Sequence, residues 1–158
     1  MAPPGTKIIA TNRRARHEYT ILDSVEAGLV LAGSEVKSLR EGHVQLADAY
    51  ARITGNEVWL EGVHIAPYAF ARGFGAHDPD RPRKLLLHAD QISRLRARVA
   101  QERLALVPLS LYFKDGRAKV ELALARGRRR EDRRAALAER DAEREVARAL
   151  GRQQKGME

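Results

Sequence analysis

Two segments of alternating apolar residues, joined by a two-residue turn, most tightly limit how this chain can fold. Residues 104–114 and 117–126 lie on either side of Asp115-Gly116, a dipeptide that readily adopts the positive φ angles of a tight hairpin turn. In the first segment, apolar residues recur at every second position, as on one face of a strand: Leu109, Leu111 and Phe113. The pattern predicts an antiparallel hairpin at the centre of a β-rich core.

The chain before residue 66 predicts further antiparallel strands. Residues 16–31 have an extended pattern, which we interpret as two short strands meeting near Ala27-Gly28. Residues 47–54 and 57–65 alternate on either side of Gly55-Asn56, which can form another tight turn. The result is a mainly β, antiparallel chain of about six short strands, which indicates a barrel or a sandwich.

Short helices are expected at the periphery of these strands. The first begins at Gly33-Ser34, where Ser34 caps the free N–H groups of the first turn, and ends at Gly42. The second covers residues 85–99, with Asp90 as its cap. Because the chain has few aromatic residues, we expect its single tryptophan, Trp59, in the core.

The charge balance narrows the class of partner. Lys and Arg total 29 against 21 Asp and Glu, a net charge of +8. Arginine predominates and makes bidentate contacts with phosphate, which favours a nucleic acid, although an anionic membrane surface also fits. No apolar run approaches the ~20 residues of a membrane span, and no signal-peptide core is recognisable. The absence of cysteine fits a reducing compartment, so we expect a cytoplasmic protein without membrane insertion.

An abrupt change of composition after Arg126 divides the chain. We expect a flexible N-terminus over residues 1–10, a β-barrel RNA-binding domain over 11–126 and a basic tail over 127–158. The tail has four arginines spaced four apart, which places them on one face of a helix: Arg140, Arg144, Arg148 and Arg152. Such a helix is marginal in water and would become ordered on phosphates. The alternative is a solvated helix whose charges only keep it soluble.

No catalytic constellation is recognisable. The acidic residues Asp48, Glu57, Asp78 and Asp80 do not show a metal-binding spacing, and the five histidines are scattered. A small ribonuclease is therefore disfavoured, and neither a metal nor a cofactor is expected. A ribosome-associated protein that binds rRNA constitutively remains open, because a β-barrel with a basic tail would look similar.

Several short motifs follow one another along most of the chain. They comprise residues 12–19, 26–28, 33–40, 81–88, 106–109 and 119–120. In this order they resemble the small protein B family, the tmRNA-binding (SsrA-binding) proteins, from about Ile8 to about Leu150. Several motifs in the correct order are far more specific than one short match.

The resemblance implies an antiparallel OB-fold-like barrel that binds the tRNA-like domain of tmRNA and delivers it to stalled ribosomes. It further implies that the tail enters the vacant decoding site and mRNA channel of the small subunit as a helix, which allows ribosome rescue and tagging of the nascent peptide. Elongation factor Tu would be met through tmRNA. The protein itself would make no covalent bond.

The resemblance also implies a set of functional residues. On the barrel, those expected to face tmRNA are Asn12, Arg14, Arg16, His17, Glu26, Lys37, Arg83, Lys84 and Lys119. In the tail, those expected to bind the ribosome are Gly127, Arg128, Arg129, Asp132, Arg133, Arg134, Arg140, Arg144 and Arg148. Glu131 stands where many members have a residue able to stack on a base. We expect Asn12, His17 and Glu26 to be exposed rather than packed in the core.

Overall fold

The computed structural model describes residues 5–68, 76–128, 140 and 144–148. It divides into two compact units, residues 1–127 and 128–158. In the second unit, Arg140 and residues 144–148 are helical. The first unit consists of β1 (Thr6–Thr11), α1 (Arg13–Glu18), β2 (Tyr19–Leu29), α2 (Gly33–Arg40), β3 (Val44–Gln45), β4 (Tyr50–Thr54), β5 (Glu57–Glu61), β6 (His64–Ile65), β7 (Arg83–Leu86), α3 (Ala89–Glu102), β8 (Ala105–Lys114) and β9 (Arg117–Gly127).

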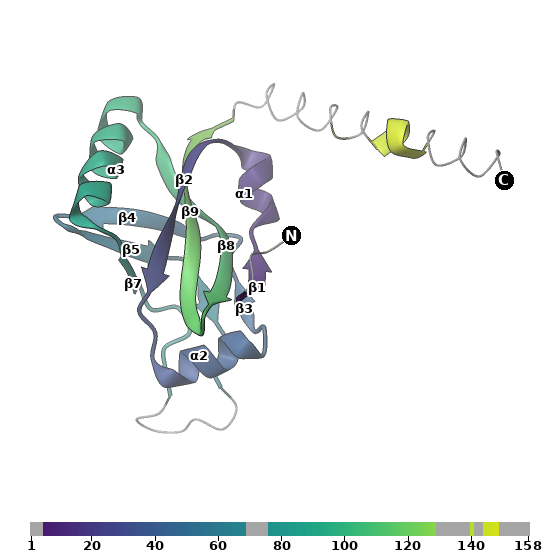
Figure 1. Ribbon diagram of the computed structural model, residues 1–158, viewed down its shortest axis with the longest axis vertical. Helices are drawn as coiled ribbons and strands as arrows, with labels where there is room; N and C mark the ends of the chain where they lie inside the picture. The colour runs from purple at the N-terminus through teal and green to yellow at the C-terminus, as the bar shows by residue number, and fades with distance from the viewer. Residues whose placement is uncertain (1–4, 69–75, 129–139, 141–143, 149–158) are drawn as a thin grey trace. The chain divides into compact units, whose positions relative to one another are not determined.

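The strands of the first unit close into an antiparallel ring (Figure 1). Around the ring, β8, β4, β5, β7, β2 and β9 pair in that order, and β9 pairs with β8 again. β1 is added outside the ring on β8, while β3 and β6 form a small separate sheet. The prediction of a mainly β, antiparallel chain with few short helices is confirmed, and six strands form the ring.

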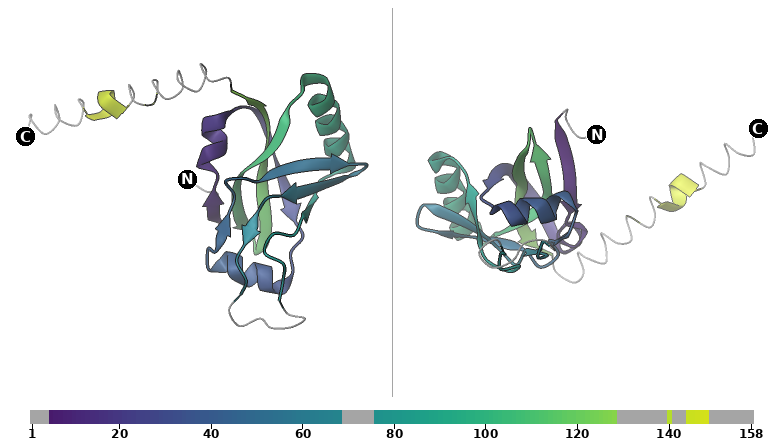
Figure 2. Two further views of the ribbon diagram at one scale, coloured as in Figure 1. Left: turned by 180° about the vertical axis from the view of Figure 1, so that it is seen from behind. Right: turned by 90° about the horizontal axis from the view of Figure 1, so that it is seen from below.

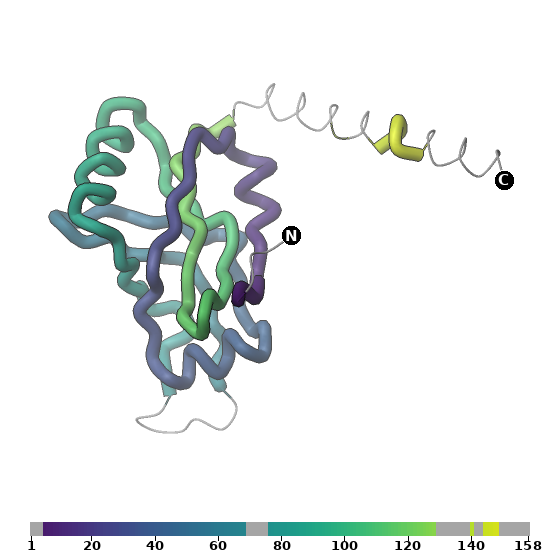
Figure 3. The backbone as a smooth tube through the Cα atoms, viewed as in Figure 1, coloured from purple at the N-terminus to yellow at the C-terminus, as the bar shows by residue number. Residues whose placement is uncertain are grey.

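The predicted hairpin is one of the two longest paired parts of this ring, the other being β2 with β9. β8 and β9 are paired from Ala105↔Ala125 to Lys114↔Arg117, and Figure 3 shows their path between β2 and β1. Asp115 and Gly116 have φ angles of 51° and 81°, the left-handed conformation that a tight hairpin turn requires.

Two of the ring's junctions are short. β4 pairs with β8 at Ala51↔Leu106, and β7 pairs with β2 at Gly28↔Leu86 and Leu29↔Leu85. The other junctions are longer, β2 and β9 being paired from Tyr19↔Gly127 to Gly28↔Lys119. We call the β4–β8 and β2–β7 junctions the two seams, because little backbone pairing holds the ring together there.

The N-terminal third departs from the sequence prediction. The two short strands expected over residues 16–31 are wrong: α1 ends at Glu18, and β2 runs as one strand from Tyr19 to Leu29. The Asn12 side chain starts α1 by accepting the Ala15 N–H at 3.1 Å, a cap that breaks the extended pattern. The flexible N-terminus expected over residues 1–10 is also wrong for residues 6–10, because β1 pairs with β8.

The helices lie at the ends of the ring. α2 lies across one end, whereas α3 stands at the other beside β4 and β5 (Figure 2). The predicted first helix is confirmed as α2, but Ser34 does not cap it: the Glu35 carboxylate accepts the Ala32 N–H at 2.8 Å instead. The prediction that the second helix starts at residue 85 is wrong. Residues 85–86 belong to β7, which pairs with β2 and β5, and α3 starts only after His88.

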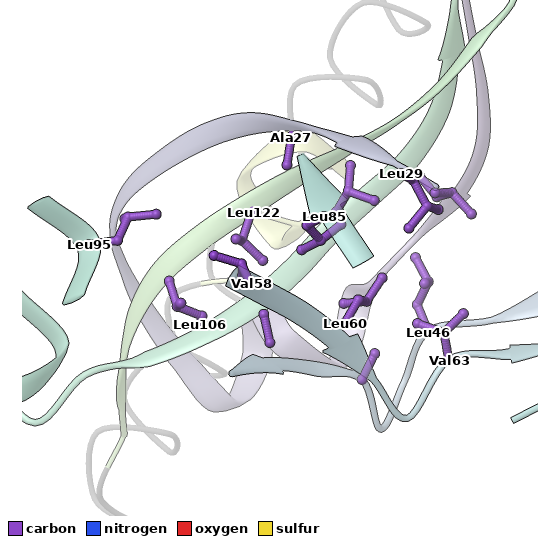
Figure 4. Packing of buried hydrophobic residues seen from close by; sticks show 14 of the residues in the cluster. Ala27, Leu29, Leu46, Val58, Leu60, Val63, Leu85, Leu95, Leu106 and Leu122 are labelled. Carbon is purple, nitrogen blue, oxygen red and sulfur yellow. The ribbon is translucent and has the colours of Figure 1, made fainter. Parts of the chain in front are cut away.

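Leucine and valine, rather than the single tryptophan, fill the ring (Figure 4). Val58 and Leu60 of β5 point inward and are 0% and 1% exposed. Trp59 lies between them in sequence and therefore points outward, where its Nε1 donates to Glu57 Oε2 at 3.1 Å. The prediction that Trp59 enters the core is wrong, because strand alternation decides which side it faces.

A fully buried ion pair anchors β7 beside α2. Arg83 and Glu35 are both 0% exposed, and Arg83 Nε donates to Glu35 Oε2 at 2.7 Å. Arg83 also donates to the Val63 and Pro79 carbonyls at 2.6 and 3.0 Å, while Arg81 donates to the same carboxylate. Burial raises the pKa of Glu35, but the hydrogen bonds from Arg81, Ala32 and Arg83 outweigh it and hold the pKa below its usual value.

Replacing Arg83 should therefore destabilise the fold strongly. Arg83→Leu leaves the Glu35 carboxylate buried with Arg81 as its remaining charged partner, and breaking a buried pair typically costs about 3–5 kcal/mol. Urea denaturation would measure the free energy of unfolding. Lys84→Leu is the matched control: Lys84 lies outside the ring, 3.5 Å from Glu57, and its exposed pair should be worth less than about 1 kcal/mol. Equal losses from both variants would contradict the anchoring role of Arg83.

Candidate nucleic-acid interface

The short helix α1 presents basic side chains on the surface. Arg13, Arg14 and Arg16 are exposed and His17 is half-buried. Arg14 is held in place, since Nε lies 3.0 Å from Glu18 Oε1 and Nη1 lies 2.8 Å from Asp48 Oδ1. The hydrogen bond and charge of Glu18 raise the pKa of Arg14. The carboxylates of Glu18 and Asp48 thus partly offset the charge of Arg14. His17 lies in the same helix, α1.

A second polar group lies on the outer face of β2, β9 and β8. Glu26 Oε2 accepts a hydrogen bond of 2.5 Å from Tyr112 Oη, and Glu26 Oε1 lies 3.5 Å from Lys114 Nζ. Lys119 pairs with Gly28 on one side and with Tyr112 on the other. The hydrogen bond from Tyr112 lowers the pKa of Glu26, and the positive charge of Lys114 lowers it further, so this carboxylate is ionised at neutral pH.

An open hollow of about 790 Å³ adjoins this polar group. Glu26, Gly28, Leu86 and Lys119 are among its lining residues. Leu86 is 54% exposed, and a Cβ on Gly28 would lie 3.3 Å from its Cβ. The hollow thus combines an apolar wall, a carboxylate and a lysine, and its volume is within the range of about 300–1,000 Å³ common for ligand sites.

The structure brings some of the expected residues together and separates others. Glu26 and Lys119 both line the hollow, and Lys84 lies two residues from Leu86 on the outer face of β7. Lys37 is exposed on α2, with its Nζ 5.4 Å from the centre of the Tyr68 ring. Sequence reasoning missed Leu86, Tyr112 and Arg117 at this site. If residues 83–86 had been recognised as a strand, the alternation of its side chains would have predicted that Leu86 faces outward.

Two of the expected residues are buried structural groups. Asn12 is 3% exposed; its Nδ2 donates to the Leu46 and Pro108 carbonyls at 3.2 and 2.9 Å, and its Oδ1 caps α1. The expectation that Asn12 is exposed is therefore wrong. Arg83, expected to face RNA, lies in the buried ion pair with Glu35 and is not accessible.

The tail is described at a few of the expected positions. Gly127 ends β9, Arg128 is half-buried, and Arg144 and Arg148 are exposed, helical residues spaced four apart. Arg140 is helical and half-buried. The other expected tail residues lie outside the described residues: Arg129, Asp132, Arg133 and Arg134, together with Glu131 and Arg152.

Within residues 5–68 and 76–128 and the described tail positions, no group of three or more His, Asp or Glu side chains could hold a metal ion. Among the helices described, none is long and apolar enough to cross a membrane. A closed β-ring with Arg117 and Lys119 beside an open hollow is an arrangement found in nucleic-acid-binding proteins.

Comparisons with known proteins make this class specific. The family model of the SmpB protein matches residues 9–152. An SsrA-binding protein of Acidothermus cellulolyticus is 59% identical over 96% of this chain and 95% of its own length. One from Mycolicibacterium smegmatis is 57% identical over 98% and 96%. The chain belongs to the SmpB protein family.

A solved structure agrees with this assignment. It is described as tmRNA-SmpB, a journey to the center of the bacterial ribosome, and one of its chains is 48% identical with a TM-score of 0.65. The match covers 81% of this chain and 93% of that chain. The resemblance stated from the motifs is thus confirmed.

The buried position of Asn12 leads to a stability prediction. Asn12→Ala removes a helix cap and leaves two buried carbonyls without their donor, so the free energy of unfolding should fall by about 2–3 kcal/mol. Arg13→Ala, an exposed change on the same helix, should stay within about 0.5 kcal/mol. Thermal or urea denaturation would measure the free energy of unfolding of both variants. Equal stability of Asn12→Ala and Arg13→Ala would show that Asn12 does not stabilise the fold.

Proposed function

We propose that this protein is the RNA-binding adaptor of trans-translation, which binds the tRNA-like domain of tmRNA and delivers it to stalled ribosomes. The family match over residues 9–152 carries this proposal, because it includes both the ring and most of the basic tail. The relatives are named for binding SsrA, and the solved neighbour is described with tmRNA and the bacterial ribosome. tmRNA and the ribosome are accordingly its partners. The protein acts as an adaptor and not as an enzyme.

The ring supplies the tmRNA-binding surface in this proposal. Arg117 and Lys119 attract phosphates at the hollow, whereas the exposed Leu86 offers an apolar contact for a base or sugar. Glu26 accepts N–H groups of a base edge, which adds specificity where lysine and arginine add affinity. Arg16 and His17 on α1, Lys37 on α2 and Lys84 on β7 extend the surface. An OB-fold-like use of the ring, with RNA on its outer face, fits this arrangement.

The tail supplies the ribosome-binding part. Residues 11–126 then act as the tmRNA-binding domain, and residues 127–158 follow as a basic segment that is helical in the vacant decoding site and mRNA channel. The helical positions Arg144 and Arg148 support this, because both are exposed and share one face. The protein meets elongation factor Tu through tmRNA and works in the cytoplasm.

The RNA that co-purifies with the full chain tests the proposal. One dominant RNA with a tRNA-like end supports it. Recovery of rRNA alone would instead favour a constitutive ribosome-associated protein, the alternative that a basic β-ring also fits.

The two parts of the chain should be separable. A variant that ends at Gly127 keeps all of β9 and the whole ring, so it should fold and bind tmRNA. It should fail to support tagging of peptides on stalled ribosomes, since the tail is absent. A reconstituted translation assay measures tagging, and a gel shift measures RNA binding. Normal tagging by the shortened chain would disprove the role given to the tail.

The four tail arginines spaced four apart, which we call the arginine column, should matter for activity but not for helicity: Arg140, Arg144, Arg148 and Arg152. The double variant Arg144→Gln/Arg148→Gln keeps helix propensity nearly constant and removes like-charge repulsion. The helical content of the free protein, measured by circular dichroism, should therefore stay equal or rise slightly. Tagging should fall, and each lost phosphate contact should reduce the log–log salt slope by about 0.7–0.9. Glu145→Gln, an exposed change beside the column, should not reduce tagging. Unchanged tagging and salt slope in the double variant would mean that the column faces solvent.

A further inference from the structure

The position of Glu26 poses an electrostatic problem. It lies on a surface that must approach phosphates, and its Cα pairs directly across from that of Glu121 on β9. Carboxylates directly opposite one another on neighbouring strands repel, and each also repels RNA. A carboxylate kept at such a place is stabilised by its neighbours. Those facing it are Tyr112 and Lys114 from β8 and Lys119 from β9.

Tyr112 makes the closest contact with this carboxylate. Its Oη donates to Glu26 Oε2 at 2.5 Å from β8, on the far side of β9. Lys114 Nζ is 3.5 Å from the other oxygen, Oε1, a longer and weaker contact. Burial raises the pKa of Tyr112, and the hydrogen bond to Glu26 raises it further, so the hydroxyl remains a donor throughout the physiological range.

We propose that Tyr112 is a positioning residue for recognition of RNA by Glu26, an inference that rests on the proposed function. The tyrosine holds Oε2 of Glu26, a residue that lines the hollow, and Oε1, whose contact with Lys114 is the longer one, is the acceptor for an N–H group of a base. Acidic side chains read base amino groups in this way. A glutamate that is already held loses less rotamer freedom when RNA arrives, and the bound geometry exists beforehand.

The side chain of Tyr112 suits this role better than a second lysine would. A neutral donor orients the carboxylate without adding a further cation to Lys114 and Lys119, which already act on it. Tyr112 is half-buried, whereas Lys114 is exposed. The Tyr112 hydroxyl, which acts through Glu26, is thus the group to remove.

The test is equilibrium binding of a transcript of the tRNA-like domain by the full chain. The variants are Tyr112→Phe, Glu26→Gln and the two combined. Tyr50→Phe is the matched control, because Tyr50 Oη donates to Glu61 Oε2 at 2.9 Å on β4 and β5, outside the hollow. Tyr112→Phe should weaken binding about tenfold, as expected for the loss of one charge-assisted hydrogen bond. In the Glu26→Gln background the same change should cost less than about twofold, and Tyr50→Phe should have no effect.

Two further measurements distinguish positioning from a general loss of structure. The salt slope of binding should not change in Tyr112→Phe, because Glu26 does not bind phosphate. In the free protein, carbon NMR of the Glu26 carboxyl should titrate at higher pH in Tyr112→Phe, since the Tyr112 hydrogen bond is the largest cause of the lowered pKa. Lys114, Lys119 and Glu121 remain in place and cannot produce this change.

The outcomes separate the two proposals. The inference is supported if the wild-type chain binds the transcript and the Tyr112→Phe and Glu26→Gln variants show the losses described above. If the wild-type chain binds the transcript but Tyr112→Phe has the same affinity as Tyr50→Phe, the inference is overturned and the proposed function stays intact. An equal loss from Tyr112→Phe with and without Glu26→Gln also overturns it, because Tyr112 would then act independently of Glu26. If the wild-type chain does not bind the transcript, the proposed function fails and the inference fails with it.

Discussion

The fold depends on closing a ring of six strands that has two short seams. Each seam is supported by a buried polar side chain. Arg83 lies in β7 at one seam and joins Glu35 of α2 to the Val63 and Pro79 carbonyls. Asn12 joins the Pro108 carbonyl of β8, near the other seam, to the carbonyl of Leu46, which directly follows β3. Hydrogen-bonded side chains thus anchor one strand of each seam, β7 at one and β8 at the other, and both sites are buried, where such bonds are strong.

This construction also positions the functional surface. The β2–β7 seam pairs Gly28 with Leu86, and both residues line the hollow beside Glu26. Because Arg83 fixes β7, it fixes the apolar wall of the hollow from inside the ring. The long β2–β9–β8 ladder then brings Glu26, Lys119 and Tyr112 side by side. One part of the surface rests on side-chain anchoring and the other on backbone pairing.

The sequence predicts what is local and misses what depends on distant partners. The β8–β9 hairpin was predictable because its turn and its alternation lie within one short stretch. Residues 85–86, which were predicted to start a helix, belong to a strand because β5 and β2 lie on either side of β7, so their apolar pattern was misleading. Asn12 and Arg83 belong to motifs shared with an RNA-binding family, and a motif does not reveal whether a polar residue touches RNA or holds the fold. The pairing of Tyr112 with Glu26 spans 86 residues and left no local pattern.

The pairing of β2 with β9 sets the order of events during synthesis. β2 leaves the ribosome early, but its long partner is the last strand of the ring, so the non-local ladder waits until most of the chain has been made. Until then, the apolar inner face of β2 has no final cover, which is the kind of transient exposure that invites aggregation. A chain interrupted before β9 therefore cannot close its ring. Incomplete copies of this protein would thus keep the apolar face of β2 exposed until they are cleared.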